Sequence, residues 1–522
     1  MKEVYDIAVV GSGFAGSIFA MIARRLGRSV LLLEQGRHPR VVIGESSTPL
    51  SNLLLEDLAL QYDLPALKPL TKWGTWQRSY PDLACGLKRG FTFYHHDLEH
   101  PAHRSSMPDQ LLVAASPHDD IADTHWYRAD LDEFLVRQAQ SLGVEFVDEV
   151  RLGTFVDEGR AVLLSGSKNG RDVTFRTRFV VDATGPRGFL HRTLRLAEAP
   201  LPSYPSTEAL YSHFSQVKRL DTLSDHLSSK AAPYPIDDAA VHHVFDGGWI
   251  WVLQFSNGIT SAGVAATAES SQRLGLSTGE EAWGRLLSRI PALADQFADR
   301  RREQPFTYVS QLSFRSSVIA GERWAMLPSA AGFVDPLLST GFPLALLGVS
   351  RLAEIIEHSW NTPALSDQLQ GYAVKTQGEL LATARLIAAL YANMKNFPVF
   401  RSLSLLYFAA ASFSETARRL GKPDLAKSFL LHDDPLFGVK CEKLLARVNK
   451  GVRIEDSRSI ARAVRELIEP IDVAGLCREP RDFCYPVLAE DLIGNAWKLG
   501  ATRQDAVELL ERAGFAAGVR CD

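Results

Sequence analysis

Residues 4–34 contain the pattern that most constrains the fold of this chain. A short apolar run at 7–10 leads into a glycine-rich turn, a longer apolar-periodic stretch follows at 14–26, and a second apolar run occupies 30–33. Short apolar runs bounded by turns are typical of buried parallel strands, and the longer periodic stretch is typical of a helix. The pattern therefore predicts a strand–helix–strand unit at the start of an α/β fold.

The turn inside this unit has the spacing of a dinucleotide-binding motif. Gly11, Gly13 and Gly16 occupy the GxGxxG positions, which provide a tight turn, close approach of a pyrophosphate and close packing of the helix. Glu34 ends the second strand, where a carboxylate can accept hydrogen bonds from both ribose hydroxyls. Because the acid is a glutamate and the unit starts the chain, we expect the ADP half of FAD rather than NADP.

Composition and charge exclude several other classes of protein. The chain is 46% apolar and 23% charged, which excludes a disordered chain, a collagen-like repeat and a coiled coil. Its net charge of −4 lacks the basic excess of a nucleic-acid binder. The five cysteines contain no CxxC pair and the N-terminus has no signal-peptide layout, so we expect a protein of the reducing cytoplasm.

Neither a membrane span nor a metal site is expected. The apolar run at 403–413 is shorter than the ~20 residues that a spanning helix needs, and the run at 331–349 contains an aspartate and prolines. A histidine cluster could suggest a metal, but its spacing on a proline-containing segment favours a pocket wall or a solvated loop. The cluster comprises His95, His96, His100 and His103.

The order of patterns along the chain predicts its organisation. We expect residues 1–360 to form an FAD-binding domain of the Rossmann type. An antiparallel substrate-binding sheet is expected to be inserted in it, at about 70–125 and 205–325. Residues 361–522 are mostly helical in pattern and are expected to form a helical C-terminal region or lid.

Three segments together resemble a known family. They are GSGFAGS at 11–17, GGWIWVLQ at 247–254 and PSAAGFVDPLLSTGFPLA at 328–345. Their order and spacing resemble the flavin-dependent halogenases, a branch of the FAD-dependent monooxygenase superfamily, over roughly residues 4–360. Leu338 stands where tryptophan halogenases carry a glutamate, so the chain is more similar to the phenol- and pyrrole-type branch.

The resemblance implies a specific chemistry. In that family reduced FAD reacts with oxygen, and a bound chloride or bromide is oxidised to hypohalous acid. The acid travels through a tunnel to a lysine, which delivers the halogen to an electron-rich substrate of secondary metabolism, an aromatic or enol that is free or carried by a carrier protein. The chain has no second GxGxxG motif for NADPH, which implies a separate flavin reductase as the source of FADH2.

The relay lysine is expected at Lys72. In the family this lysine lies in a strand beyond the loop that corresponds to residues 44–50, and Lys72 is followed by a small residue and aromatics as the pattern requires. Burial would lower its pKa, so that a neutral amine could hydrogen-bond to hypohalous acid or react with it. Lys68 and Lys88 are the alternative candidates.

The resemblance also implies sites for the halide, the tunnel and the cofactor. Thr340 and Gly341 belong to a turn whose N–H groups would hold the halide, because helix N-termini bind anions. Trp249 and Trp251 would line the tunnel. The expected FAD contacts are Gly11, Gly13, Phe14, Ala15, Gly16, Glu34, Ser46, Arg128, Asp182, Gly185, Ser329, Asp335 and Gly341.

Two departures from the family pattern keep other functions open. Leu253 and Gln254 replace an Ile-Pro pair at the end of the tryptophan motif, and Pro328-Ser329 replaces a Gly-Asp pair. The favoured reading is an FADH2- and O2-dependent halogenase. The alternatives are a flavin monooxygenase or oxidase without halogenation, and a catalytically idle FAD-binding protein.

Overall fold

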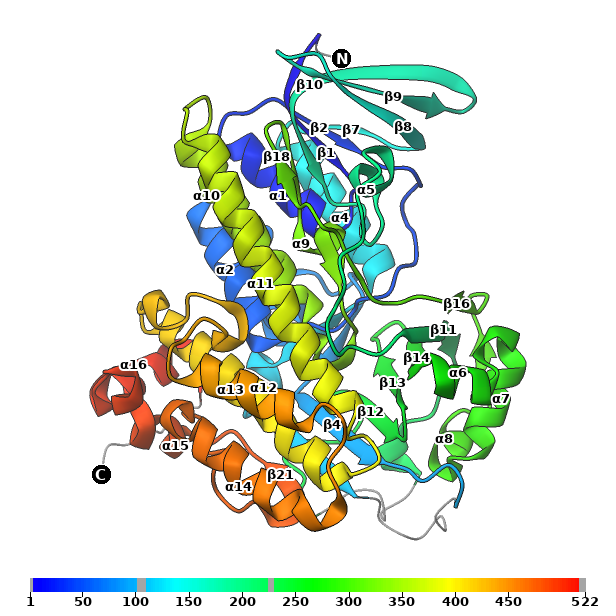
Figure 1. Cartoon of the computed structure of the whole chain (residues 1–522), viewed down its shortest axis with the longest axis vertical. Helices are drawn as coiled ribbons and strands as arrows, with labels where there is room; N and C mark the ends of the chain where they lie inside the picture. The colour runs from blue at the N-terminus through cyan, green and yellow to red at the C-terminus, as the bar shows by residue number, and fades with distance from the viewer. Residues whose placement is uncertain (1–2, 101–108, 224–229, 516–522) are drawn as a thin grey trace.

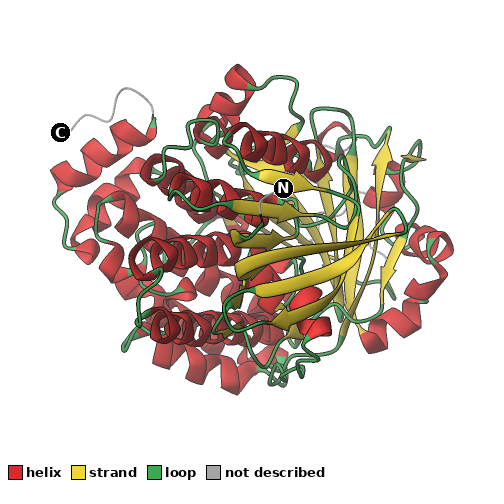
Figure 2. Cartoon of the chain, turned by 90° about the horizontal axis from the view of Figure 1, so that it is seen from above, coloured by secondary structure: helices red, strands yellow, loops and turns green. Residues whose placement is uncertain are grey.

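The computed structural model describes residues 3–100, 109–223 and 230–515. Figure 1 shows a first sheet at one end of the molecule, a second sheet at the other, and long helices that run between them. Seen from above, the strands gather on one side and most helices on the other (Figure 2). The predicted His103 lies outside the described residues.

The first sheet is the predicted α/β sheet. Its strand order is β18-β19-β10-β1-β2-β7, and β1 pairs in parallel with both β2 and β10. The strands are β1 (Tyr5–Val10), β2 (Val30–Leu33), β7 (Glu145–Val147), β8 (Val150–Asp157), β9 (Val162–Lys168), β10 (Arg171–Asp182), β18 (Ala320–Gly321) and β19 (Trp324–Met326). The antiparallel strands β8 and β9 extend from β10 as a side hairpin. Every residue of β2 is buried, as expected for a parallel strand covered on both faces.

Three helices pack beside this sheet and confirm the predicted strand–helix–strand unit. They are α1 (Phe14–Arg25), α4 (Arg128–Ser141) and α10 (Gly341–Ser359). Helix α4 begins at Arg128, and Tyr127 precedes it without a side-chain cap. A further helix, α2 (Pro49–Gln61), begins where Thr48 and Ser51 form a capping box.

The second sheet contains nine strands in the order β15-β11-β14-β13-β12-β4-β5-β21, with β16 beside β11. They are β4 (Gly90–His95), β5 (Gln110–Ala114), β11 (Thr207–Ser215), β12 (Ala240–Phe245), β13 (Gly248–Gln254), β14 (Thr260–Thr267), β15 (Arg301–Arg302), β16 (Thr307–Val309) and β21 (Cys484–Tyr485). Most pairings are antiparallel as predicted. The pairs β12–β4 and β21–β5 are parallel, because these neighbours come from segments far apart in the chain.

The smaller elements complete these layers. The short strands are β3 (Cys85–Lys88), which pairs with β6 (Asp123–Trp126), and β17 (Phe314–Arg315), which pairs with β20 (Gly332–Phe333). The remaining helices of this part are α3 (Trp73–Ser79), α5 (Phe189–Thr193), α6 (Ala268–Leu274), α7 (Glu280–Ser288), α8 (Pro291–Gln296) and α9 (Pro328–Ala331).

The C-terminal part is mainly helical but is not a separate layer. Its helices are α11 (Leu365–Tyr391), α12 (Phe397–Arg419), α13 (Phe437–Val448), α14 (Ser457–Ile468), α15 (Ala489–Asn495) and α16 (Arg503–Ala513). One buried apolar cluster includes both Ile7 of β1 and Leu510 of α16, so the core is continuous across the predicted boundary at residue 360. The tail also supplies β21 to the second sheet.

Two described helices are long and apolar enough to cross a membrane. For Leu337–Ser359 and Phe397–Arg419, 78% and 67% of the apolar window is buried inside the protein. Core helices pass the same test of length and composition, so this evidence for a span is weak. Among the described residues, no group of three or more His, Cys, Asp or Glu side chains is placed to hold a metal ion.

Candidate active site

The glycine turn between β1 and α1 is shaped as its motif requires. Gly11 has φ +104°, and a Cβ there would lie 2.6 Å from the carbonyl oxygen of Ala183. A Cβ on Gly16 would collide with the carbonyl oxygen of Gly11. Beside Gly13, by contrast, the nearest atom to a Cβ is at the end of the Arg128 side chain, 3.3 Å away. At Gly13, the glycine that a pyrophosphate would approach, the neighbours are therefore side-chain ends and not backbone.

Glu34 is held ionised at the end of β2. It is 5% exposed and accepts hydrogen bonds from the N–H and hydroxyl of Ser12, at 3.1 and 2.9 Å, and from the N–H of Gly36 at 2.9 Å. Burial alone would raise the pKa of Glu34, but Arg40 at 3.2 Å and these donors lower it below its usual value. Sequence reasoning missed Ser12 and Arg40, and the expected ribose contact of Glu34 stays a prediction.

Arg128 connects three segments beside this turn. Its guanidinium makes two hydrogen bonds to Asp132, both 2.8 Å, and donates a third to the carbonyl of Gly44 at 3.0 Å. It also lies 5.0 Å from the centre of the Phe14 ring. The hydroxyl oxygen of Ser46 is buried and has no hydrogen-bond partner among the described residues. An orphaned hydroxyl two residues beyond the carbonyl that Arg128 binds fits a polar ligand such as the expected FAD.

The second turn near the cofactor region is organised by Asp182. Its carboxylate is 0% exposed and accepts hydrogen bonds from Thr184 and from the N–H of Leu190. The structure thus places Asp182 beneath the turn, as its internal organiser, rather than on the surface that a cofactor would touch. Gly185 has φ +82° and open space around a would-be Cβ, and Ser329 is half-buried on α9, so both remain candidates.

The turn that precedes α10 meets the glycine turn. Leu338 and Ser339 adopt left-handed backbone angles, with φ of +64° and +55°, and Thr340 is buried at the N-cap of α10. Gly341 is exposed, and a Cβ there would meet nothing within 4 Å. The ring of Phe342 stacks on that of Phe14, with centroids 4.8 Å apart. The N-terminal motif and the motif at 328–345 are therefore side by side, and the space around Gly341 is open.

The carboxylate of Asp335, an expected FAD contact, is part of a buried hydrogen-bond network within the protein. One oxygen accepts from the hydroxyls of Tyr204 and Tyr391, both at 2.9 Å, and the other accepts from the N–H of Leu337 at 2.9 Å. Burial raises the pKa of Asp335 to about 6. The indole N–H of Trp249 donates to the Tyr391 hydroxyl at 3.1 Å, so the network joins the tryptophan motif to the motif at 328–345.

Both predicted tunnel tryptophans are buried on β13. Trp249 is 1% and Trp251 6% exposed, and their rings are 5.7 Å apart. Leu253 is buried, and Gln254 at the end of the strand donates to Asp237 at 3.2 Å. The departure from the family pattern is therefore absorbed by a local hydrogen bond at the end of β13.

The three candidate lysines have very different surroundings. Lys72 was expected in a strand. It lies instead at the N-cap of α3, directly after a 3-10 turn at residues 68–71. Its Nζ donates to the carbonyl of Ala513 at 3.0 Å, and burial lowers its pKa. Lys68 is exposed.

Lys88 is the most deeply buried of these lysines. It is 0% exposed on β3, its Nζ donates to the carbonyl of Ser47 at 2.5 Å, and it lies 3.9 Å from the centre of the Phe91 ring. Asp123 is its cross-strand partner on β6. Burial lowers the pKa of the Lys88 ammonium and raises that of the Asp123 carboxyl.

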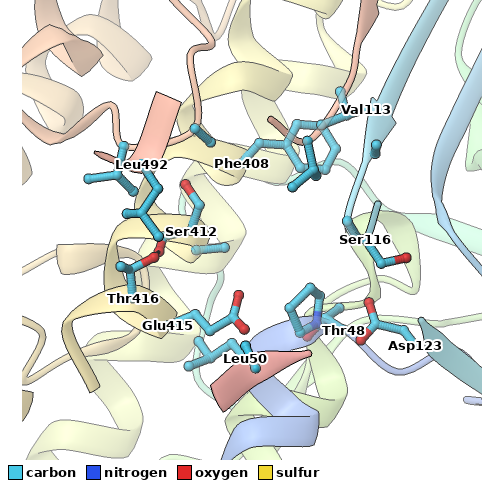
Figure 3. Close-up of a pocket in the computed structure, with 18 of the residues that line it drawn as sticks. Thr48, Leu50, Val113, Ser116, Asp123, Phe408, Ser412, Glu415, Thr416 and Leu492 are labelled. Atoms are coloured by element: carbon cyan, nitrogen blue, oxygen red, sulfur yellow. Dashed lines mark hydrogen bonds between the residues drawn. The ribbon is translucent and has the colours of Figure 1, made fainter. Parts of the chain in front are cut away.

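A cavity of about 190 Å³ opens in front of this pair. Figure 3 shows apolar Val113, Phe408 and Leu492 on one side and Thr48, Asp123 and Glu415 on the opposite side. Lys72 also lines it, together with residues of the C-terminal tail up to Phe515. The sequence patterns missed this cavity, because its wall combines segments from both ends of the chain.

Known proteins resemble the chain over most of its length. A family model described as FAD dependent oxidoreductase matches residues 6–308. The monodechloroaminopyrrolnitrin halogenase PrnC of Pseudomonas fluorescens is 27% identical over 385 residues, which is 72% of this chain and 66% of that protein. The tetracycline 7-halogenase of Kitasatospora aureofaciens is 27% identical over 433 residues, 78% of this chain and 73% of that protein.

A solved structure shares the fold. The crystal structure of halogenase PltM in complex with phloroglucinol and FAD superposes with a TM-score of 0.78 at 23% identity, covering 92% of this chain and 99% of that one. The family match identifies FAD as the cofactor, and its contact with the glycine turn stays a prediction. The chain belongs to the FAD-dependent oxidoreductase family, and the relatives named above, to which it is similar over most of its length, are halogenases.

Proposed function

We propose that the protein halogenates an electron-rich small molecule in the cavity beside Lys88, using FADH2, O2 and chloride or bromide. Bound FAD, once reduced, would supply two of the electrons that convert O2 to water, and the halide and substrate would supply the other two. The single observation that carries the proposal is a fully buried lysine directly behind the wall of a substrate-sized cavity, in a chain of this family.

The surroundings of Lys88 favour it over Lys72 as the relay. A relay must present a partly neutral amine in a dry place, where it can hydrogen-bond to hypohalous acid and hold it beside the substrate. Lys88 is fully buried among Phe91 and Asp123, which both line the cavity, and burial lowers its pKa. Lys72 is only half-buried, and its Nζ donates to the tail at Ala513. Lys72 stays the alternative relay.

The turn before α10 is proposed as the halide site. Thr340 is buried at the N-cap without a side-chain cap, and the free N–H groups of a 19-residue helix carry a partial positive charge. The aromatic contacts of Phe342 with Phe14 hold this turn beside the cofactor turn. FADH2 would come from a separate reductase in the same cytoplasmic compartment.

The test compares Lys88→Met with Lys72→Met. Each variant is supplied with a flavin reductase, O2 and bromide across a phenol, pyrrole and indole panel, and product is measured by mass spectrometry per FADH2 oxidised. We expect Lys88→Met to lose on the order of 10²-fold or more of the halogenated product, because a positioning and acid–base group is lost, while FAD binding remains. Lys72→Met should lose less than about tenfold, because only a contact with the tail is removed.

Two results would change the assignment. If Lys72→Met loses the product and Lys88→Met does not, the relay is Lys72. Oxygenated product that forms without halide, at equal yield in the parent and both variants, would establish the monooxygenase alternative.

A further inference from the structure

The cavity beside Lys88 has two carboxylates in its lining, and they differ in how far they are open to it. Asp123 is 5% exposed, its Oδ1 accepts from Nδ2 of Asn52 at 2.7 Å, and its Oδ2 is covered by the protein. The side chain of Glu415 is 20% exposed, and Figure 3 shows its carboxylate pointing into the cavity from α12. Glu415 is therefore the carboxylate that a bound molecule can touch.

One face of α12 places Glu415 in the cavity. Phe408, Ser412, Glu415 and Arg419 follow one another at intervals of three or four residues, so they lie on one side of the helix, and all four line the cavity. This face changes from an aromatic ring at Phe408 to charged groups at its C-terminal end. A flat molecule that packs on Phe408 therefore shares the cavity with a carboxylate.

Arg419 fixes the orientation of this carboxylate. Its Nε donates to Oε1 of Glu415 at 2.8 Å, and its Nη1 lies 3.7 Å from the carboxylate of Glu56 on α2. Of these two carboxylates, only that of Glu415 lines the cavity. Because the hydrogen bond from Arg419 uses Oε1, Oε2 of Glu415 can accept a proton from a bound molecule.

The other ionisable side chains of the described lining are poor proton acceptors. Burial raises the pKa of both Tyr407 and Tyr485, so each keeps its own proton. The amine of Lys72 donates to the tail, and the guanidinium of Arg419 stays protonated. The described lining contains no histidine. Glu415 is thus the base that this cavity offers.

Halogenation of a ring carbon requires such a base. When the carbon attacks hypohalous acid, the C–X bond forms and the O–X bond breaks, which leaves hydroxide and a cationic ring whose carbon carries both hydrogen and halogen. The C–H bond must then break, and its electron pair returns to the ring. A base that takes this proton and passes it to the hydroxide completes the reaction as Ar–H + HOX → Ar–X + H2O.

We propose that Glu415 is a catalytic residue, the general base that removes the ring proton after halogen transfer. The halogen and the proton belong to the same carbon, so the group that holds the hypohalous acid and the base must both reach it. Asp123, the cross-strand partner of Lys88, lies on the same side of the cavity as Glu415 (Figure 3). The inference rests on the proposed function, because halogen transfer is the step that creates the acidic ring proton.

The test replaces the ring hydrogens by deuterium. The FAD-loaded enzyme receives a flavin reductase, O2, bromide and either phenol, pyrrole or indole, with the ring-hydrogen and ring-deuterium forms in separate reactions. Mass spectrometry measures the rate of brominated product. We expect equal rates for the two forms in the parent, because a positioned base makes proton loss fast.

Glu415→Gln should make proton loss slow. The amide keeps an oxygen for Arg419 but is not a base, so product should form about tenfold more slowly or worse, and the ring-hydrogen form should react about twofold faster than the deuterium form, or more. Glu56→Gln is the matched control, because it removes a carboxylate beside the same arginine outside the cavity lining. It should stay within twofold of the parent, with equal rates for both forms.

A rescue experiment separates a base from a structural role. Glu415→Ala leaves space for a small carboxylate, so added formate should restore product formation and abolish the isotope effect. A residue that only supported the fold would not respond to formate in this way.

Several outcomes would overturn the proposal. They are an isotope effect already present in the parent, its absence in a folded Glu415→Gln variant, and an equal effect in Glu56→Gln. If Glu415→Gln does not fold, as judged by circular dichroism, the isotope effect of the parent and the formate response of Glu415→Ala decide. Brominated product at the parent's rate in Glu415→Gln would refute this inference alone, whereas absence of product from the parent would refute the proposed function and the inference with it.

Discussion

The acidic side chains at the cofactor turn and at the substrate cavity differ in how fully the protein pairs them. At the cofactor turn, the oxygens of Glu34 already accept from Ser12, Gly36 and Arg40, so its geometry is set before any ligand arrives. In the cavity, Asp123 and Ser116 retain unpaired polar atoms. The chain thus pairs the carboxylate at the cofactor turn with its own donors, whereas it leaves polar atoms unpaired at the substrate cavity.

The largest expected effect concerns the preformed turn. Gly13→Val should lower FAD affinity by at least about 100-fold, because the added side chain would occupy the place beside Gly13 that a pyrophosphate would approach. Thermal stability of the FAD-free protein should change little, since no backbone atom lies close to a Cβ there. Flavin titration and thermal unfolding measure the two quantities.

A matched control separates this effect from a general response to valine. Gly153 lies on β8, and a Cβ there would meet nothing within 4 Å. Gly153→Val should bind FAD like the parent. If Gly13→Val also binds FAD like the parent, the turn is not the cofactor site and the comparison fails.

The second prediction concerns Asp335, at the junction of the two regions. Its pKa is raised to about 6 by burial, so the folded state binds its proton more tightly than the unfolded state, whose usual value is 3.8. This contribution is fully present below pH 3.8 and is lost as pH rises through about 6, and it amounts to at most about 3 kcal/mol. The free energy of unfolding of the parent should therefore fall between pH 4 and 6, and Asp335→Asn should remove this decrease.

Denaturant unfolding at several pH values measures this slope. Asp367→Asn is the control, because Asp367 is exposed in the first turn of α11 and its variant should keep the parent's slope. If Asp335→Asn keeps the parent's slope, the pKa of Asp335 is not raised in the parent, and the prediction is contradicted.

The smallest expected effect concerns the segment that closes the cavity. Thr502 caps α16 in a capping box with Asp505, and Thr502→Ala should destabilise this helix by about 1 kcal/mol. Limited proteolysis should cut α16 several times faster, while FAD affinity stays within twofold. Thr278→Ala should leave proteolysis of α16 unchanged, because the Thr278 hydroxyl donates to the carbonyl of Gly275 and accepts from Arg285, neither of which lies in α16.

A loss of FAD affinity in Thr502→Ala would contradict the separation of the two regions. It would mean that the tail supports the cofactor turn as well as the cavity.

The contrast between the two regions also explains what the sequence could predict. The strand–helix–strand unit was predictable because Gly11, Gly16 and Glu34 act within one short segment and each glycine has a local steric reason. The motif at 328–345 was recognisable for the same reason. The Asp335 network was not, because Tyr204 and Tyr391 reach it from opposite sides in the sequence.

The cavity was hidden for a related reason. Lys88 and Asp123 face each other only because β3 and β6 pair, and Ala513 reaches Lys72 across 441 positions.

The tail has a consequence for how such a protein can diversify. Residues 484–515 add β21 to the edge of β5 and contribute Leu492, Leu510 and Phe515 to the cavity. None of the cofactor-turn contacts described above comes from this stretch. A graft of the corresponding stretch from a relative would therefore exchange part of the substrate preference in one recombination event, while the redox half of the protein is inherited unaltered.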